Sequence, residues 1–236
     1  MPNHSVNDST VVKFSAAPLC FELGLDGIIS GRLWYRYVWN DTRLAYDPAK
    51  FGGIKVIRVN PSFLWTPDII LYNREAPLEA AQYPDKTLSS NCLVYPSGKV
   101  LWVLISFFTK FILVNILFCV FQVPEAFFGA RCKSLDDEGL NLDDPWADQT
   151  CQLKWGSWTY DSQLMPLELY NDDGVDLSEY SKYCPTKVVR ATAETVTKYY
   201  DCCPEPYQSN VYNITLRRNF IVSNEMLIKN PRRDVP

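Results

Sequence analysis

The chain has 236 residues, of which 47% are hydrophobic, so it is long enough to form one large domain with a sizeable core. The formal net charge is −4 and no basic block occurs, which excludes the charge pattern of a nucleic-acid-binding surface and a polybasic membrane-binding segment. Tyr, Trp, Phe, Val and Thr recur in short alternating runs punctuated by Pro and Gly, a pattern that predicts a single all-β domain.

The histidine content narrows the possible functions. His4 is the only histidine, and it lies in a polar amino-terminal tail that we place at residues 1–12. A single histidine in a tail excludes histidine-based catalytic triads and histidine-ligated zinc. We therefore predict that the chain is not an enzyme and that it holds no cofactor and no metal ion.

Cysteines and glycosylation sequons indicate the compartment in which the chain folds. It has eight cysteines, and Asn-X-Ser/Thr sequons begin at Asn3, Asn7, Asn40 and Asn213. This combination is typical of the oxidising secretory route. Residues 1–25 lack the basic and apolar pattern of a signal peptide, so we expect either that a leader is missing from this sequence or that Met1 is not the natural start.

Strand alternation is clearest in residues 33–39. One face of this predicted strand carries Leu33, Tyr35, Tyr37 and Trp39, and the other carries Trp34, Arg36 and Val38. Arg36 marks the second face as the more hydrated one. Trp34 on that face therefore lies either at an interface or binding site, or half covered by neighbouring side chains.

The next segments predict a turn, a buried strand and a hairpin. The turn Trp65-Thr66-Pro67-Asp68 leads into a short apolar run that ends in Tyr72, and a polar loop follows at residues 74–90. A strand at residues 93–95, the turn Pro96-Ser97-Gly98 and a returning strand at residues 99–102 together indicate a hairpin.

Residues 103–122 break this pattern. They form a run of twenty residues in which Lys110 is the only charge, long enough to span a bilayer as a helix. Farther along, Cys132 and Cys151 bracket an acidic, turn-rich segment. The strand that follows, at residues 153–160, carries Lys154, Gly156, Trp158 and Tyr160 on one side.

The last element is a hairpin whose two strands cover residues 186–200 and 211–218. Its tip contains the adjacent cysteines Cys202 and Cys203, with Tyr200 before them and Tyr207 after them. A bond between neighbouring cysteines closes a small strained ring, which is found mainly where function requires it. The alternative is a reduced pair in an ordinary loop. Two prolines stiffen the tip, which therefore presents the cysteines and both tyrosines to a partner.

With these segments in hand, the chain resembles the extracellular ligand-binding domain of a nicotinic acetylcholine receptor of the alpha type, a Cys-loop pentameric ligand-gated channel. It is similar also to the soluble acetylcholine-binding proteins. The resemblance covers residues 13–228 and is interrupted at 103–122. Its markers are Trp34 with Trp39-Asn40-Asp41 and Arg43-Leu44; Gly52-Gly53-Ile54; Trp65-Thr66-Pro67-Asp68 with Leu71-Tyr72-Asn73; Cys151-Gln152-Leu153-Lys154-Trp155-Gly156-Ser157-Trp158-Thr159-Tyr160; and Tyr200-Asp201-Cys202-Cys203 with Pro206-Tyr207.

The resemblance implies a twisted immunoglobulin-like β-sandwich of about ten strands, assembled as a homo- or heteropentamer with ligand bound between neighbouring subunits. The ligand would be acetylcholine or a similar quaternary or cationic amine, held by aromatic faces. The resemblance places Tyr72, Trp158, Tyr200, Cys202, Cys203 and Tyr207 on the principal side of the site, and Trp34, Arg36, Leu93 and Leu101 on the complementary side. For Trp158 the alternative is an ordinary core tryptophan. The implied disulfides are Cys132 with Cys151 and Cys202 with Cys203, whereas Cys20, Cys92, Cys119 and Cys184 have no implied partner.

Two features depart from the family pattern. The segment between Cys132 and Cys151 is longer than in the family, and Asp144-Pro145-Trp146-Ala147 alters its apolar tip. No apolar span follows residue 227, and residues 229–236 form a charged tail. We therefore predict an extracellular neurotransmitter-binding domain on the outer side of the plasma membrane, which gates a cation channel if it is joined to a pore domain. The alternative is a secreted acetylcholine-binding protein without a channel.

We also predict that residues 103–122 do not belong to the working fold. A membrane span there would separate Trp34 and Tyr72 from Trp158 and Tyr207, and a sandwich has no room for such a helix between paired strands. Deleting the stretch joins residue 102 directly to residue 123 and restores the family pattern. The boundaries are compatible with a retained intron, and a real insertion is the alternative. If the stretch is present, we expect an exposed apolar excursion from the sandwich.

Overall fold

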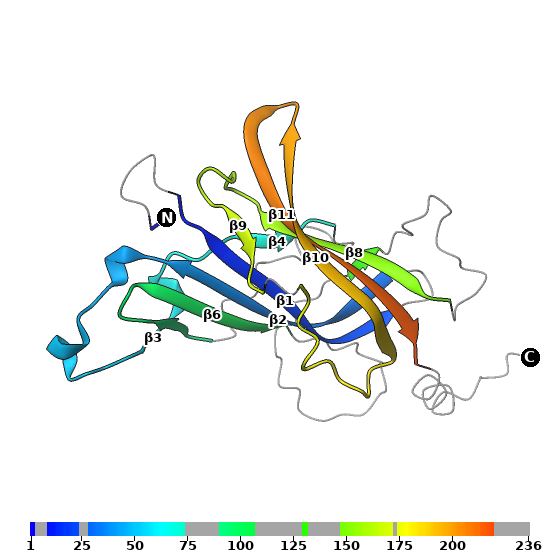
Figure 1. Ribbon diagram of the computed structural model, residues 1–236, viewed down its shortest axis with the longest axis horizontal. Coiled ribbons are helices and arrows are strands. Elements are labelled where there is room, and N and C mark those ends of the chain that lie inside the picture. Colours follow the sequence, from blue (N-terminus) through cyan, green and yellow to red (C-terminus); the bar gives the residue numbers. More distant parts are fainter. Residues whose placement is uncertain are drawn as a thin grey trace, which may run out of the picture.

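The structure is a computed structural model that describes residues 1–2, 9–23, 28–73, 90–106, 129–131, 147–171 and 174–219. Within these residues the regular structure is almost entirely strand, arranged as two sheets that pack face to face (Figure 1). Three short 3-10 helices, η1 (Thr42–Leu44), η2 (Pro48–Phe51) and η3 (Pro61–Phe63), lie in the connections. The predicted all-β, immunoglobulin-like sandwich is confirmed.

The first sheet has the strand order β3-β5-β6-β2-β1-β9, with β7 paired to β2. Its strands are β1 (Val12–Leu23), β2 (Ile28–Asn40), β3 (Ile57–Val59), β5 (Cys92–Val94), β6 (Lys99–Ser106), β7 (Gly129–Arg131) and β9 (Leu167–Leu169). The second sheet has the order β10-β11-β8-β4. Its strands are β4 (Ile69–Leu71), β8 (Gln149–Ser157), β10 (Thr186–Tyr200) and β11 (Cys203–Arg218).

The alternation predicted for residues 33–39 is seen in β2. Leu33, Tyr37 and Trp39 are almost completely buried, whereas Trp34 and Arg36 on the opposite face are partly exposed. The inward side chains fill the core between the sheets, where aromatic rings meet edge to face or tilted. The rings of Trp155 and Tyr212 lie 4.8 Å apart. Such ring contacts add to the free energy gained from burying apolar area.

The predicted hairpin of β5 and β6 is also confirmed. The amide of Tyr95 donates to the carbonyl of Lys99 at 2.9 Å, and Gly98 closes the turn with a φ of +83°. A Cβ atom at Gly98 would collide with the backbone of Asp41. Only glycine combines that backbone conformation with so close an approach.

β6 continues into the apolar stretch, which corrects one expectation. The strand runs to Ser106 and pairs with β2 along its length, and Leu104 is buried in register with Val100 and Trp102. The expectation that the stretch leaves the sandwich at Val103 is therefore wrong for its first four residues. The reason is that Val103 and Ile105 are β-branched residues, which suit an extended strand. Whether residues 103–122 are foreign to the working protein stays a prediction.

Several other predictions concern residues outside the described part of the chain. These are His4, the sequons at Asn3 and Asn7, the loop at 74–89, residues 107–122, Cys119, Cys132, the altered segment up to Trp146, and the tail at 229–236. Cys151 is buried and disulfide-bonded, and its expected partner, Cys132, is among these residues. Within the described ranges, no helix has the length and apolar character needed to cross a membrane.

The amino-terminal boundary of the sandwich is earlier than predicted. β1 begins at Val12, which is fully buried, and the amide of Thr10 donates to the carbonyl of Leu164 at 2.9 Å. Residues 10–12 therefore belong to the folded domain and not to a polar tail. Their backbone bonds attach the start of β1 to the segment before β9.

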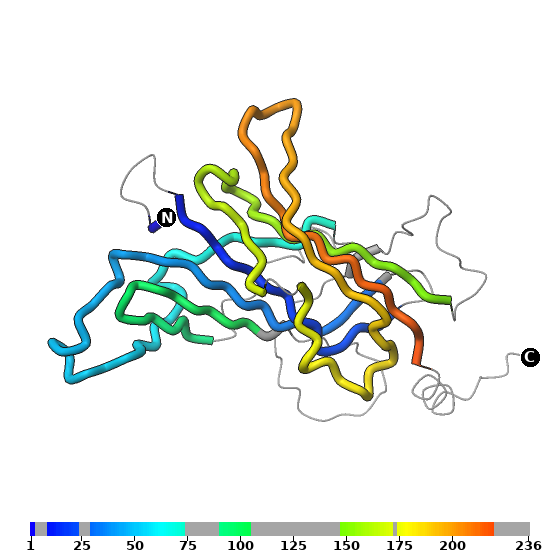
Figure 2. Tube along the Cα trace, in the orientation of Figure 1, coloured from blue at the N-terminus to red at the C-terminus, as the bar shows by residue number. Residues whose placement is uncertain are grey.

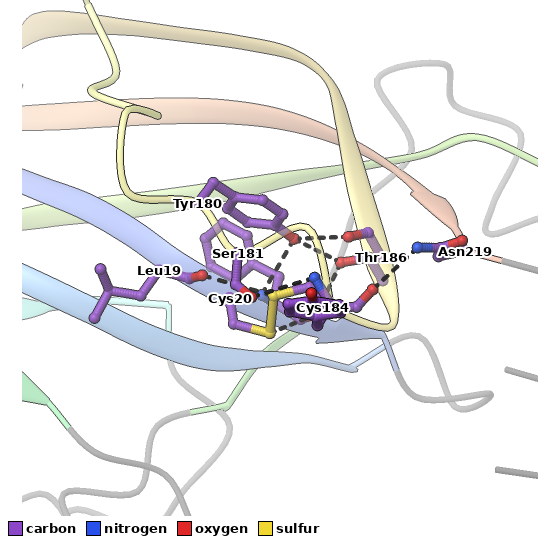
Figure 3. Close-up of a disulfide and its surroundings, with 9 residues drawn as sticks. Leu19, Cys20, Tyr180, Ser181, Cys184, Thr186 and Asn219 are labelled. Carbon is purple, nitrogen blue, oxygen red and sulfur yellow. Dashed lines mark hydrogen bonds between the residues drawn. A yellow bond between two sulfur atoms is a disulfide. The ribbon is translucent and has the colours of Figure 1, made fainter. Parts of the chain in front are cut away.

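A disulfide between Cys20 and Cys184 joins the two sheets, with 5.6 Å between the Cα atoms (Figure 3). Cys20 lies in β1, and Cys184 lies just before β10. Hydrogen bonds surround the bridge: the amide of Ser181 donates to the carbonyl of Leu19 at 2.9 Å, and the hydroxyl of Thr186 donates to the carbonyl of Phe21 at 2.8 Å. Neither cysteine had a partner implied by the family resemblance.

Candidate functional site

Most of the predicted principal-side residues gather on one face of the four-stranded sheet. Tyr72 follows β4, Trp158 follows β8, Tyr200 ends β10 and Tyr207 lies in β11. The hairpin of β10 and β11 extends beyond the body of the sandwich, as the orange loop in Figure 2 shows, and Tyr200 lies opposite Cys203 at its turn. Because side chains alternate along a strand, the inward positions of β8 fill the core while Gly156 faces outward beneath this group.

Tyr200 and Tyr207 form one pair within this group. Their ring centroids lie 5.6 Å apart, and the planes cross at 73°. This edge-to-face arrangement is a favourable geometry for two aromatic rings. It leaves the face of one ring directed away from its partner, and Tyr200 remains 40% exposed. The pair can therefore present an electron-rich surface to a ligand.

Tyr72 is fixed at the base of the group. Its hydroxyl donates to the carbonyl of Ser157, and its amide donates to the carbonyl of Lys154 at 2.8 Å. The ring lies across Gly156, where a Cβ atom would collide with the ring. Burial raises the pKa of the Tyr72 hydroxyl to about 12, and the neighbouring acidic groups, Tyr200 first among them, act in the same direction. The hydroxyl therefore stays protonated and remains a donor at neutral pH.

Trp158 is positioned through its backbone, and its side chain is 61% exposed. Its amide donates to the carbonyl of Asp68 at 3.3 Å. The carboxylate of Asp68 accepts from the hydroxyl of Ser157 at 2.6 Å and from the amide of Thr159 at 2.7 Å. Asp68 thus holds the residues on both sides of Trp158. An exposed indole on an anchored loop is not a core tryptophan, so that alternative is wrong.

The loop that carries Trp158 is also tied to the hairpin. The amide and the hydroxyl of Ser162 both donate to the carbonyl of Pro206, each at 2.8 Å. Pro206 directly precedes Tyr207. These bonds connect the loop after β8 to the strand that carries one of the site tyrosines.

The predicted bond between Cys202 and Cys203 is absent, because both cysteines are free thiols. The hairpin turns tightly, with Tyr200 opposite Cys203 in the register and only Asp201 and Cys202 between them. An ordinary two-residue turn of this kind does not need the distorted geometry that a bond between neighbouring cysteines imposes. The interpretation of a stiff tip that presents aromatic side chains does not depend on that bond.

The predicted complementary-side residues lie elsewhere, on the outer face of the first sheet. Leu93 is opposite Leu101 in the pairing of β5 with β6, and Trp34 and Arg36 occupy the partly exposed face of β2. Arg36 pairs with Asp176 at 2.7 Å, and its guanidinium lies 5.9 Å from the ring centre of Tyr170. The structure therefore does not bring these four residues together with the aromatic group of the same chain.

Three further residues at the site were not predicted. Asp68 was noted only as part of a turn motif. Its position as an acidic residue immediately before a buried strand is the signal that could have identified it as a site residue. Lys154 and Lys198 place their ammonium nitrogens 5.6 Å from the ring centre of Tyr72 and 4.7 Å from that of Tyr200. Alternation in the strand at residues 153–160 put Lys154 on the side of Trp158, but its contact with Tyr72 and the placement of Lys198 depend on how the strands of this sheet are paired.

Comparisons with known proteins agree with this geometry. A family model described as the neurotransmitter-gated ion-channel ligand binding domain matches residues 25–116 and 143–220. The chain is similar to acetylcholine receptor subunit alpha-L1 of Schistocerca gregaria, with 31% identity over 86% of this chain and 32% of the relative. It is 32% identical to acetylcholine receptor subunit alpha-like 2 of Drosophila melanogaster, over 86% of this chain and 32% of the relative. For neuronal acetylcholine receptor subunit alpha-2 of Mus musculus the identity is 30%, over 92% of this chain and 37% of the relative. The chain thus spans about a third of the length of these relatives.

Proposed function

Because the chain belongs to the family of neurotransmitter-gated ion-channel ligand-binding domains, we propose that it binds a small organic cation, acetylcholine or a related amine, against the outer face of its four-stranded sheet. The observation that carries the proposal is the ring pair of Tyr200 and Tyr207 together with Tyr72, whose hydroxyl binds the residue directly before the exposed Trp158.

The aromatic group suits a quaternary ammonium because such a cation has no hydrogen to donate. A protein binds it by surrounding it with electron-rich ring faces, each contributing about 0.5–2 kcal/mol depending on desolvation. Trp supplies the strongest such face. The indole of Trp158 has no aromatic partner among the described residues, and exposed apolar surface of this kind gains free energy when a ligand covers it.

The proposal extends to assembly. Ligand sites between subunits need two different surfaces, and this chain carries the second candidate surface on its other sheet, at Trp34, Arg36, Leu93 and Leu101. Two copies placed side by side would bring the aromatic group of one against this surface of the next. We therefore propose a ring of five like subunits, either identical or mixed. The ring would lie on the extracellular side of the plasma membrane. Where a pore domain is attached, ligand binding would gate a cation channel.

The experiment is a titration of the purified chain with acetylcholine, followed by tryptophan fluorescence and calorimetry. We expect saturable binding to the unmodified chain and no measurable binding to Trp158→Ala. Tyr183→Ala is the matched control, since it removes an aromatic side chain that is 75% exposed but lies outside the group. Unchanged affinity in a folded Trp158→Ala variant would contradict the site, and equal loss in the control would contradict its specificity.

A further inference from the structure

Two lysines approach the aromatic group from the outer face of the four-stranded sheet. Lys154 in β8 lies over Tyr72 and Lys198 in β10 lies over Tyr200, with 5.6 Å and 4.7 Å between nitrogen and ring centre. Strand pairing explains the convergence. Lys198 is opposite Tyr207, and Lys154 is opposite Val211 on the same face of β11.

Neither lysine is neutralised within the described part of the chain. Basic side chains elsewhere in that part do form ion pairs, as Lys13 does with Glu168 at 3.5 Å and Arg36 with Asp176 at 2.7 Å. Lys154 and Lys198 contact tyrosine rings and no carboxylate. Burial lowers the pKa of Lys154, and the positive charge of Lys198 lowers it further.

Carboxylates also act on the aromatic group, at Tyr207. Tyr207 has a raised pKa, caused first by desolvation and by its contact with Cys203, and then by the negative charges of Glu205 and Asp161. These carboxylates belong to the hairpin tip and to the loop after Trp158. The site thus combines two ammonium groups, over the rings of Tyr72 and Tyr200, with carboxylates that act on Tyr207 and with the Asp68 carboxylate near Tyr72.

From this arrangement we propose that the preferred ligand is a zwitterionic amine, with an ammonium group that lies against Trp158 and Tyr207 and a carboxylate that lies between Lys154 and Lys198. The inference rests on the proposed function, because it concerns the same aromatic site. A ligand that carries only a positive charge would be repelled by the ammonium groups of Lys154 and Lys198, which lie over two of the tyrosine rings that should attract it. A ligand carboxylate removes that repulsion and forms charge-assisted hydrogen bonds to the lysines.

Lysine placed over tyrosine does not by itself mark a site. Lys99 lies 5.8 Å from the ring centre of Tyr95, and Lys182 lies 5.1 Å from that of Tyr183. The two lysines at the site differ because both lie over tyrosines of one aromatic group. Lys182 is therefore the matched control: it carries the same charge over a single exposed ring, away from Trp158.

The test compares two ligands that share a trimethylammonium group. Glycine betaine carries a carboxylate where choline carries a hydroxyl. In calorimetric titrations of the full chain at low salt, we expect betaine to bind more tightly than choline by roughly tenfold, the effect of one charge-assisted interaction. The double variant Lys154→Gln, Lys198→Gln should lose this preference by weakening betaine and strengthening choline, whereas Lys182→Gln should retain it.

The outcomes separate the inference from the proposed function. If choline or tetramethylammonium binds the unmodified chain as tightly as betaine does, or if the double variant keeps the preference for betaine, the inference is wrong and the aromatic cation site stands. If acetylcholine binds and none of these three amines does, the inference is wrong; if acetylcholine also fails to bind, the proposed function is wrong as well. Near-ultraviolet circular dichroism verifies that both variants keep the native fold.

Discussion

The amide of Trp158 donates to the backbone carbonyl of Asp68 at 3.3 Å, and the carboxylate of the same aspartate binds the residues on either side of that tryptophan. One residue at the entry to β4 therefore orients a loop at the exit from β8. The exposed indole owes its direction to this backbone arrangement, because its side chain is largely open to solvent.

Asp68→Ala tests this positioning role. The change leaves the hydroxyl of Ser157 and the amide of Thr159 without their acceptor, so we expect the free energy of unfolding to fall by about 1–3 kcal/mol. We also expect affinity for acetylcholine to fall by roughly tenfold or more, since a displaced binding group loses much of its interaction energy. Urea unfolding and calorimetry measure the two effects. Asp68→Asn keeps an acceptor for the Ser157 hydroxyl, so its stability and affinity should lie between those of the unmodified chain and those of Asp68→Ala. Equal affinity in all three proteins would rule out a role for Asp68 in the site.

Gly156→Ala tests whether Tyr72 needs the space beneath its ring. The new methyl group would overlap the hydroxyl end of that ring, so Tyr72 must move away from Ser157. We expect weaker ligand binding and a changed tyrosine signal in near-ultraviolet circular dichroism. Tyr72→Phe removes only the hydroxyl and leaves the ring in place, so it should weaken binding less. A larger loss in Tyr72→Phe than in Gly156→Ala would show that the hydroxyl, and not the position of the ring, is what matters.

Cys20→Ser tests the link between the sheets. The bridge joins residues 164 positions apart, and removing a native disulfide from a secreted domain typically costs about 2–5 kcal/mol of stability. We expect a loss of that size in urea unfolding under non-reducing conditions. Cys202→Ser is the control, because that thiol is free and exposed, and its effect should stay within about 0.5 kcal/mol. A Cys20→Ser protein as stable as this control would show that the bridge does not stabilise the fold.

The pair formed by Arg36 and Asp176 predicts a dependence on pH. Hydrogen bonds from Ser178, followed by the contact with Arg36, lower the pKa of Asp176 below its ordinary value. A carboxyl group whose pKa is lower in the folded state stabilises the fold above the unfolded value of about 3.9, and this contribution is lost as the pH falls through the folded value. We therefore expect Asp176→Asn to be less stable than the unmodified chain at pH 7 and more nearly equal to it near pH 3. Urea unfolding midpoints of both proteins, measured between pH 7 and pH 3, test this expectation. A stability difference that does not change with pH would contradict a lowered pKa for Asp176.

Local patterns were enough to predict much of the fold. The alternation through Leu33, Tyr37 and Trp39 identified β2 and its buried face, and the turn ending in Gly98 identified the hairpin of β5 and β6. Both features depend on residues close together in the sequence. The convergence of Tyr72, Tyr200 and Tyr207 was also expected, but only because the chain resembles a known family.

Features set by distant pairing could not be predicted in this way. The partnership of Cys20 with Cys184 depends on how β1 packs near the start of β10, and eight cysteines allow many pairings. Lys154 and Lys198 lie on strands that flank β11, an arrangement that the local sequence around Lys198 does not reveal. The bond expected between Cys202 and Cys203 was inferred from the family, whereas the backbone of this hairpin forms an ordinary tight turn.

The bridge between Cys20 and Cys184 also decides how the chain carries mechanical load. A force applied between β1 and β11 passes through the covalent bond into the segment before β10 and bypasses everything between the two cysteines. At about 3.5 Å of contour length per residue, the crosslink withholds roughly 570 Å of extension. Pulled from its ends, the oxidised chain can therefore release only the segments outside the two cysteines, which include β10 and β11, while β2 to β9 and the loop of Trp158 remain inside a closed ring that tension does not reach.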